Sequence, residues 1–92
     1  MCDLDDFKQI NDSYGHMAGD MVIRTFSTLI KHSIRNVDLP ARFGGEEFTI
    51  ILPMTTSEGT YIVAERIRKK LEKYVFKFKG EQFKVTVSMG IA

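Results

Sequence analysis

The sequence predicts an α+β fold in which helices pack on one antiparallel sheet, a ferredoxin-like arrangement. Two observations lead to this class. Stretches that alternate apolar and polar residues, and stretches with apolar residues three or four apart, follow one another in the order β-α-α-β-β-α-β. Tight turns containing glycine join neighbouring strands directly, which is typical of antiparallel pairing. With 92 residues, 43% of them hydrophobic, residues 1–92 are expected to lie within a single small domain.

The first third of the chain is predicted to contain a strand and two helices. Residues 1–4 form the end of a buried strand, and Asp5 or Asp6 is placed to cap a short helix. The apolar face of that helix comprises Phe7, Ile10 and Tyr14. The sequence YGHMAGD interrupts it, and a longer helix is predicted from about Met17 to Ile34. Its apolar positions are Val22, Phe26, Leu29 and Ile30.

The middle of the chain is predicted to form a hairpin followed by a third helix. The segments LPARF (39–43) and FTIILP (48–53) flank two glycines and have the composition of antiparallel strands. Thr55 and Glu58 have the spacing of a capping box, so a helix is predicted from there to about Tyr74. The inner face of this helix comprises Val63, Ile67 and Leu71.

The last part of the chain is predicted to form a small hairpin that turns at Gly80 and leads into a strand over KVTVSMGIA. The apolar side of that strand comprises Val85, Val87, Met89 and Ile91. The first strand lacks a visible beginning, and no element follows the last strand. We therefore expect Met1 to be an internal methionine of a longer domain.

Charge and cysteine content exclude several classes of function. The net charge is +1 and the basic residues are scattered, which disfavours a nucleic-acid partner or contact of this segment with a membrane. Cys2 is the only cysteine, so no internal disulfide is possible, and the composition suits a reducing cytoplasm. The longest apolar runs are a few residues, too short for a membrane span or a signal peptide.

The segment RFGGEEF, residues 42–48, places two glycines and two acids between predicted strands, although neither pair favours a strand. Asp3 ends the first strand, and Glu46 and Glu47 lie at the hairpin tip. If that strand lies beside the hairpin, these acids converge and require a neutralising cation, for which oxygen ligands favour Mg²⁺. Lys8 could then contact substrate phosphates, which suits phosphoryl or nucleotidyl transfer. The simpler interpretation, from spacing alone, is a solvated hairpin tip.

Three separated motifs point to a family. CDLDDFKQINDSYGHMAGD, RNVDLPARFGGEEF and VSMGIA closely resemble the GGDEF family of diguanylate cyclases, in its GGEEF version, over essentially the whole chain. The resemblance implies condensation of two GTP molecules into cyclic di-GMP with Mg²⁺ or Mn²⁺. It also implies a nucleotidyl-cyclase fold, akin to polymerase palm domains.

The resemblance assigns the acids to a metal site and to catalysis. Asp3 resembles the metal aspartate at the strand end, and the Leu4 carbonyl resembles a backbone metal ligand. Glu46 matches an acid that binds metal and helps to activate the 3′-hydroxyl. Glu47 matches the second required acid of the signature.

The resemblance also assigns substrate contacts. The glycines of the turn, Gly44 and Gly45, match positions that let the nucleotide lie close to the backbone, and Lys8 matches a phosphate contact. Asn11 and Asp20 match the residues that read guanine, whose N1–H and N2–H donors a carboxylate can accept together. On its own, Asp20 is also explained as a favourable acid in the first turn of the long helix. His16, in the YGH turn, is expected to be structural.

Arg35 and Asp38, with five residues between Asp38 and Gly44, match the R-x-x-D motif that binds the product and inhibits the enzyme. Arginine presents a planar fork to phosphate or to guanine acceptors, and aspartate accepts from guanine donors. On its own, the pair is also explained as an ion pair at a helix C-terminus. Arg66 aligns with an arginine that completes this site from a neighbouring domain in some members, although a solvated helix surface is the simpler interpretation.

Two elements of the family pattern are absent: the upstream helical segment with its LTGLxNR motif and the closing helix. The sequence thus predicts the central part of a diguanylate cyclase catalytic domain that acts as a homodimer, binds GTP and cyclic di-GMP, and is cytoplasmic. A regulatory sensory domain, with or without a membrane anchor, is expected in the parent chain. The alternatives are a non-catalytic cyclic di-GMP or GTP sensor and a protein-interaction module.

Overall fold

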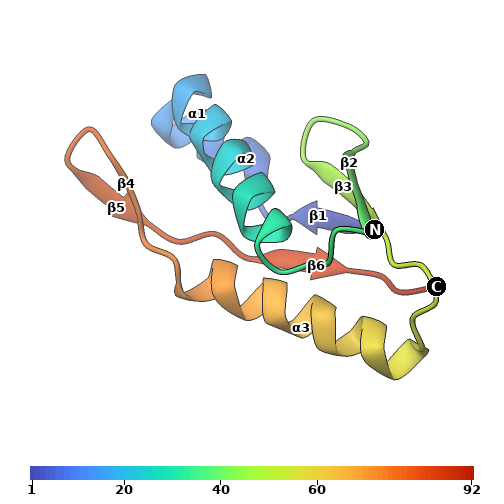
Figure 1. Ribbon diagram of the computed structural model, residues 1–92. Helices are drawn as coiled ribbons and strands as arrows, with labels where there is room; N and C mark the ends of the chain where they lie inside the picture. The colour runs from blue at the N-terminus through green and yellow to red at the C-terminus, as the bar shows by residue number, and fades with distance from the viewer.

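A four-stranded sheet with the strand order β2-β3-β1-β6 forms the centre of the molecule (Figure 1). The computed structural model describes residues 1–92. The strands of this sheet are Cys2–Leu4 (β1), Leu39–Arg42 (β2), Glu47–Ile51 (β3) and Val87–Met89 (β6). Every neighbouring pair is antiparallel, as the short turns predicted. The first strand therefore lies in the interior of the sheet, between the middle hairpin and the last strand.

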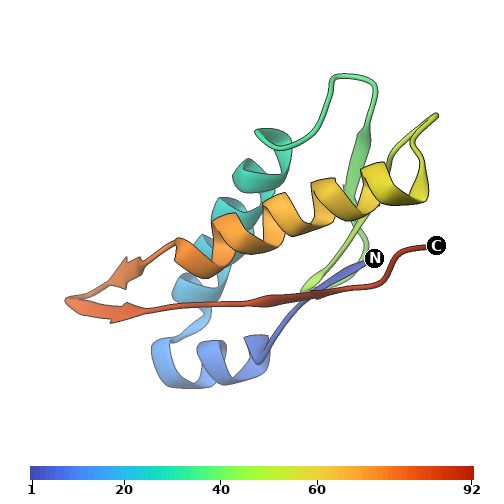
Figure 2. The same ribbon diagram turned by 90° about the horizontal axis from the view of Figure 1, so that it is seen from below.

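Three helices pack beside the sheet. They are Phe7–Tyr14 (α1), His16–Lys31 (α2) and Ser57–Lys73 (α3). Figure 2 shows α3 running across the molecule close to β6, with α1 and α2 side by side beyond it. Gly15, with φ +91°, separates α1 from α2 in a conformation that side chains disfavour. None of the three helices has the length and apolar composition of a membrane span.

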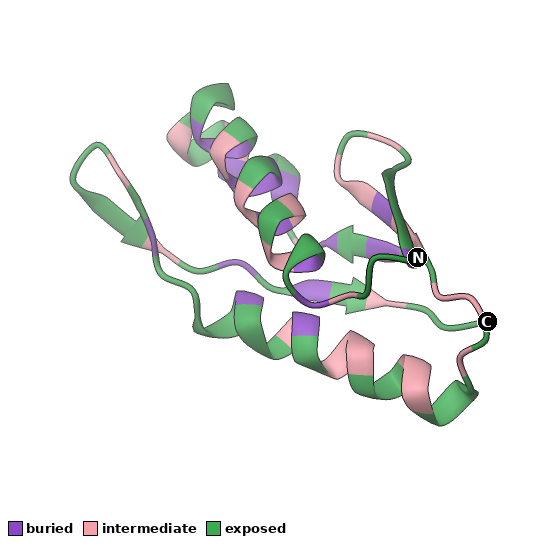
Figure 3. Ribbon diagram, viewed as in Figure 1, coloured by how far each residue is buried: buried purple, intermediate pink, exposed green.

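The core lies between the helices and one face of the sheet (Figure 3). Strand register places Cys2, Leu4, Phe48 and Val87 on this face, and all four are buried. The ring of Phe26 in α2 meets Phe48 edge to face, with centroids 4.9 Å apart. Burying one such side chain contributes about 1.5–3 kcal/mol, so this face accounts for much of the stability.

The small hairpin predicted to turn at Gly80 is confirmed, and it does not join the main sheet. Strands β4 (Phe76–Phe78) and β5 (Glu81–Phe83) form a separate hairpin, which turns through Lys79 and Gly80, both with positive φ. Phe83 stacks on Tyr14 of α1 with centroids 4.4 Å apart and on Phe76 at 5.4 Å. The Phe83–Tyr14 stack and the buried Phe76 side chain, and not strand pairing, therefore join this hairpin to the rest of the molecule.

The ends of two elements also differ from the predictions. Helix α2 ends at Lys31, short of Ile34, because Ser33 turns back to donate its amide to Ile30 at 2.9 Å and its hydroxyl to Leu29 at 2.7 Å. The apolar strand face ends before Ile91, which lies beyond β6 and is exposed.

The predicted caps are wrong at both sites. Asp6 occupies the N-cap of α1 in a left-handed conformation and makes no side-chain capping bond. The carboxylate of Asp5 instead accepts hydrogen bonds from the hydroxyls of Thr86 and Ser88, at 2.8 and 2.6 Å. Thr56, and not Thr55, caps α3: its hydroxyl accepts the Gly59 amide at 3.0 Å. Glu58 is consequently one position too early for a capping box.

Candidate functional site

The face of the sheet opposite the core carries acidic and hydroxyl side chains. Asp3 lies directly across from Glu47 on β3 and from Ser88 on β6. Asp3 is exposed and Glu47 is half-buried. The two carboxylates thus face each other at the end of β1, as the proposed adjacency of the first strand and the hairpin requires.

Glu46 meets the first strand through the backbone. The Leu4 amide donates to the Glu46 carbonyl at 3.2 Å, but the reciprocal bond from the Glu46 amide to the Leu4 carbonyl is not made. An ordinary antiparallel pair at this position would exchange both bonds. The sheet therefore opens at this point and leaves the Leu4 carbonyl without a partner on β3.

The two glycines of the turn are not required by the turn itself. Neither Gly44 nor Gly45 has a positive φ. A Cβ added at Gly45 would meet no atom within 4 Å, and one at Gly44 would meet only the Glu47 Oε1 at 3.6 Å, an ordinary contact. Nothing within the chain explains two residues without side chains here. The space beside the turn is open to another molecule.

The Arg42 side chain stabilises this turn through hydrogen bonds, a role that was not predicted from the sequence. Its Nε donates to the carbonyls of Gly44 and Gly45, both at 3.2 Å, and its Nη2 donates to Gly45 at 2.8 Å. Because of these bonds, both carbonyl groups point toward the Arg42 side chain. The only sequence signal was a cation two residues before the first glycine of the turn, which is not specific to this arrangement.

The acids do not form a ready metal cluster. No group of three His, Cys, Asp or Glu side chains lies close enough to hold an ion. Asp3, Glu46 and Glu47 take part in none of the ion pairs of the chain. Their donor chemistry, carboxylates beside a carbonyl without a partner on β3, is nevertheless the oxygen set that Mg²⁺ and Mn²⁺ prefer. The residues fit a divalent cation, and the ligand set stays a prediction.

The residues matched to guanine and phosphate lie on two helices that pack against each other, α1 and α2. Lys8 and Asn11 are three residues apart and share one face of α1. Gly19 on α2 is buried, and a Cβ there would overlap the Asn11 Oδ1 and come within 3.2 Å of the Phe7 ring. Gly19 therefore lets the Asn11 amide lie against α2, and Asp20, the next residue of α2, is exposed. His16 begins α2 and is exposed.

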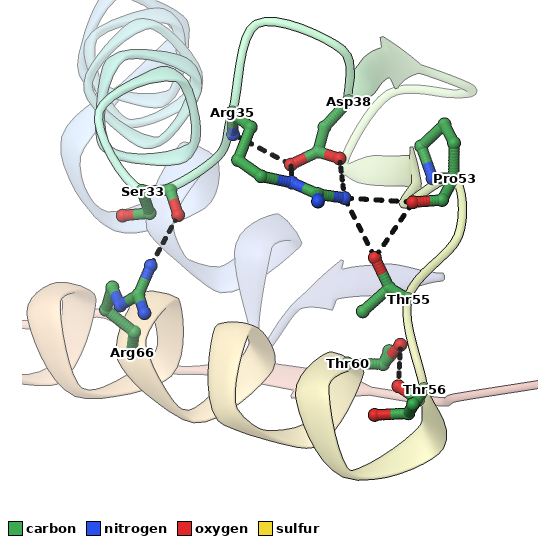
Figure 4. A network of polar contacts seen from close by, with 8 residues as sticks. All are labelled: Ser33, Arg35, Asp38, Pro53, Thr55, Thr56, Thr60 and Arg66. Atoms are coloured by element: carbon green, nitrogen blue, oxygen red, sulfur yellow. Dashed lines mark hydrogen bonds and ion pairs between the residues drawn. The ribbon is translucent and has the colours of Figure 1, made fainter.

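A second polar cluster lies between the end of α2 and the start of α3 (Figure 4). The Arg35 amide donates to the Asp38 Oδ2 at 2.7 Å, and its Nη2 donates to the Asp38 Oδ1 at 2.9 Å. The same Nη2 donates to the Pro53 carbonyl at 2.9 Å and to the Thr55 hydroxyl at 2.8 Å. The Asp38 side chain is 1% exposed, whereas that of Arg35 is 56% exposed.

This ion pair shifts the ionisation of both partners. The side-chain hydrogen bond from Arg35 lowers the pKa of Asp38, and the same bond raises the pKa of Arg35. Both groups are therefore held in their charged forms. Burial alone would raise the pKa of Asp38, and the hydrogen bonds from Arg35 outweigh this effect.

Arg66 lies in the same cluster. Its Nη1 donates to the Ser33 carbonyl at 2.9 Å (Figure 4). Together with Arg35 and Asp38 it lines a cavity of about 580 Å³. The resemblance implied an arginine from a neighbouring domain, but here one chain places both arginines at one cavity.

Comparisons with known proteins agree with this geometry. The family model described as "Diguanylate cyclase, GGDEF domain" matches residues 1–92. Diguanylate cyclase A of Treponema denticola is 46% identical over 92 residues, which are 100% of this chain and 25% of that protein. The chain spans a quarter or less of the length of the curated relatives it matches.

Solved structures confirm the predicted fold class. Diguanylate cyclase SiaD of Pseudomonas aeruginosa, solved with its activator SiaC, matches with a TM-score of 0.90 and 37% identity, covering 95% of this chain and 34% of that one. The GGDEF domain of DgcB from Caulobacter crescentus, solved with c-di-GMP, matches with a TM-score of 0.90 and 34% identity. That match covers 95% of this chain and 53% of the DgcB chain.

Proposed function

The chain belongs to the GGDEF family of diguanylate cyclase domains, and we propose that it binds GTP and joins two GTP molecules into cyclic di-GMP with release of pyrophosphate. The observation that carries this proposal is the junction of β1 with the glycine turn. There Asp3 faces Glu47, Leu4 bonds to Glu46, and the adjacent glycines leave open space.

Each residue at the junction has a proposed role. The carboxylates of Asp3 and Glu46 and the carbonyl of Leu4 would hold Mg²⁺ or Mn²⁺. When bound, the cation would neutralise charge on the phosphates and polarise the α-phosphate. Glu46, with Glu47 beside it, would accept the proton of the 3′-hydroxyl. The 3′-oxygen then bonds to the α-phosphorus of the second GTP, and the bond to pyrophosphate breaks.

Recognition of guanine is proposed on α1 and α2. The Asp20 carboxylate would accept N1–H and N2–H, and Asn11 would contact the same base edge. Adenine lacks this pair of donors, so a carboxylate facing it would lose hydrogen bonds to water without replacement. Lys8, on the same face of α1 as Asn11, would contact the phosphates.

The reaction needs two sites. Each GTP supplies a 3′-hydroxyl to the α-phosphate of the other, so two domains must face each other across a two-fold axis. We therefore propose a homodimer of catalytic domains. A regulatory domain in the parent chain would control how often the two sites meet, in the cytoplasm where GTP is available.

Arg35, Asp38 and Arg66 are proposed to bind cyclic di-GMP and inhibit the enzyme. The support is a cavity with two arginines and one ionised aspartate, which matches phosphates and guanine donors in charge. Arg35→Ala should let cyclic di-GMP accumulate to a higher level before the reaction stalls. Stalling of wild type and variant at the same level would contradict the inhibitory role.

One experiment tests the main proposal. The complete protein is incubated with GTP and Mg²⁺, and both nucleotide binding and product are measured. We expect cyclic di-GMP and pyrophosphate. Binding without product would instead indicate a nucleotide sensor, and neither binding nor product would indicate a protein-interaction module.

A further inference from the structure

One edge of the Arg35 guanidinium is hydrogen-bonded within the chain, and the other edge is not. Its Nη2 donates to Asp38, Pro53 and Thr55 at 2.8–2.9 Å, and its Nε lies 3.4 Å from the Asp38 Oδ2. Its Nη1 makes no hydrogen bond within the chain (Figure 4). The exposed part of this side chain therefore includes a nitrogen with two free donor hydrogens.

The partners of Arg35 lie at different distances from it along the sequence. Asp38 is only three residues away, so this pair can move as one unit with its loop. Thr55 belongs to a different segment, the connection between β3 and α3, and it lies two residues before the first residue of α3. The Thr55 bond is thus a side-chain link between the loop that carries Arg35 and the start of the helix that carries Arg66.

The Thr55 hydroxyl both donates and accepts a hydrogen bond in this link. It donates to the Pro53 carbonyl at 3.1 Å and accepts from the Arg35 Nη2 at 2.8 Å. Its methyl group lies against the first turn of α3, where a Cβ on Gly59 would come within 3.0 Å of it. Gly59 therefore makes room for Thr55 in this position. Both the hydroxyl and the methyl group have defined contacts.

We propose that Thr55 is a positioning residue for product inhibition, a role that rests on the proposed product site. By joining Arg35 to the start of α3, Thr55 sets the separation of Arg35 and Arg66 before the ligand arrives. Two cations at a set separation can meet the phosphates of one cyclic dinucleotide without first being ordered. Without the Thr55 bond, the Arg35 side chain keeps only the Pro53 carbonyl as a partner in this connection, so it is held less firmly relative to α3 and binding has to order it further.

The test measures binding of cyclic di-GMP to the complete protein by calorimetry. Thr55→Val keeps the shape but removes the hydroxyl, and it should weaken binding about three- to tenfold, the cost of ordering one long side chain. Thr55→Ser keeps the hydroxyl and should retain most of the affinity. The control is Thr60→Val, because the Thr60 hydroxyl donates to the Thr56 carbonyl at 3.0 Å and does not contact Arg35 (Figure 4).

Arg35→Ala separates two kinds of failure. If wild type does not bind cyclic di-GMP, or if Arg35→Ala binds as wild type does, the proposed product site itself is wrong. If Arg35→Ala loses binding while Thr55→Val does not, only the role of Thr55 is overturned. Equal losses for Thr55→Val and Thr55→Ser, or for Thr55→Val and Thr60→Val, would show a structural effect unrelated to the hydroxyl and would also overturn it.

Discussion

The molecule has two polar clusters: the R-x-x-D cluster around Arg35 and Asp38, and the strand-end cluster of Asp3, Leu4, Glu46 and Glu47. The two clusters differ in how many of their polar groups have a partner within the chain. At the R-x-x-D cluster, Asp38 is buried and paired, and Arg35 has four acceptor atoms within the chain. At the strand-end cluster, Asp3 and Glu47 face each other as like charges, and the Leu4 carbonyl lacks its partner on β3. Like charges directly opposite in a sheet are destabilising.

The difference indicates what each cluster needs from a ligand. The R-x-x-D cluster is formed before any ligand arrives, so a ligand there only adds contacts to a set arrangement. The strand-end cluster has an excess of negative charge and open space, so a cation and a phosphate would complete it. Substitutions at the first cluster should therefore affect stability and product inhibition, whereas substitutions at the second should affect turnover.

The largest expected effect is at the strand end. Asp3→Asn or Glu46→Gln removes one negative ligand without changing size and should lower turnover by at least about 10²–10³-fold, the cost of losing one electrostatic contact in a transition state. Thermal stability should be unchanged or slightly higher, because charge repulsion falls. Cyclic di-GMP formation and thermal unfolding are measured together, with exposed Asp12→Asn on α1 as the control. Near-normal product formation by either variant at limiting Mg²⁺ would exclude the metal assignment.

Asp20 should show the next largest effect. Asp20→Ala is expected to weaken GTP binding by about 1–3 kcal/mol, because the donors of guanine would lose their partner. ATP, which lacks these donors, should be affected far less. Binding of both nucleotides is measured by calorimetry with Mg²⁺. Equal losses for GTP and ATP would mean that Asp20 acts only through the stability of α2.

The glycine turn allows a sharper comparison of activity with stability. Gly45→Ala meets no atom of the chain and has no positive φ to strain, so it should leave stability unchanged or raise it by up to about 1 kcal/mol. Turnover should fall if a nucleotide lies against the turn, because the added methyl group occupies its place. Gly90→Ala, another position with open space around its Cβ, is the control. Unchanged activity of Gly45→Ala would show that the open space has no role.

The smallest effect concerns acid stability at the R-x-x-D cluster. Because Arg35 lowers the pKa of Asp38, the ionised form contributes stability above the ordinary carboxyl pKa of about 4. That contribution is lost as the pH falls through the lower pKa of the folded state. Melting temperatures between about pH 6 and pH 2.5 should therefore fall less steeply for Asp38→Asn than for wild type. Asp12→Asn should keep the wild-type slope, and identical slopes for Asp38→Asn and wild type would contradict the prediction.

The sequence predicted features that depend on local pattern and chain order. The adjacency of β1 and the hairpin was the condition set by the metal hypothesis, and the sheet meets it by pairing Asp3 with Glu47. The break between α1 and α2 followed from Gly15. These features need only short-range information, or a topology with few alternatives.

Features that depend on which side chain reaches which backbone atom were not predicted. Thr55 and Thr56 are adjacent threonines before a helix, and only the path of the chain decides that the second caps it. Arg42 braces the glycine turn through carbonyl bonds that no residue spacing encodes. The position of the β4–β5 hairpin outside the main sheet depends on the stacking of Phe83 on Tyr14. This is a tertiary contact between residues far apart in sequence.

The interior position of β1 has a consequence for biosynthesis. Its two hydrogen-bonded neighbours come from the middle and from the end of the chain, so Cys2 pairs with both Phe48 and Met89. Closing such distant contacts is entropically costly and slow compared with forming helices. While a ribosome is still adding residues, α1 and α2 can form, but Asp3 has no completed sheet to hold it. The acidic junction can therefore form only after β6 has been synthesised. Until then β1 lacks its partner strands and is accessible to chaperones.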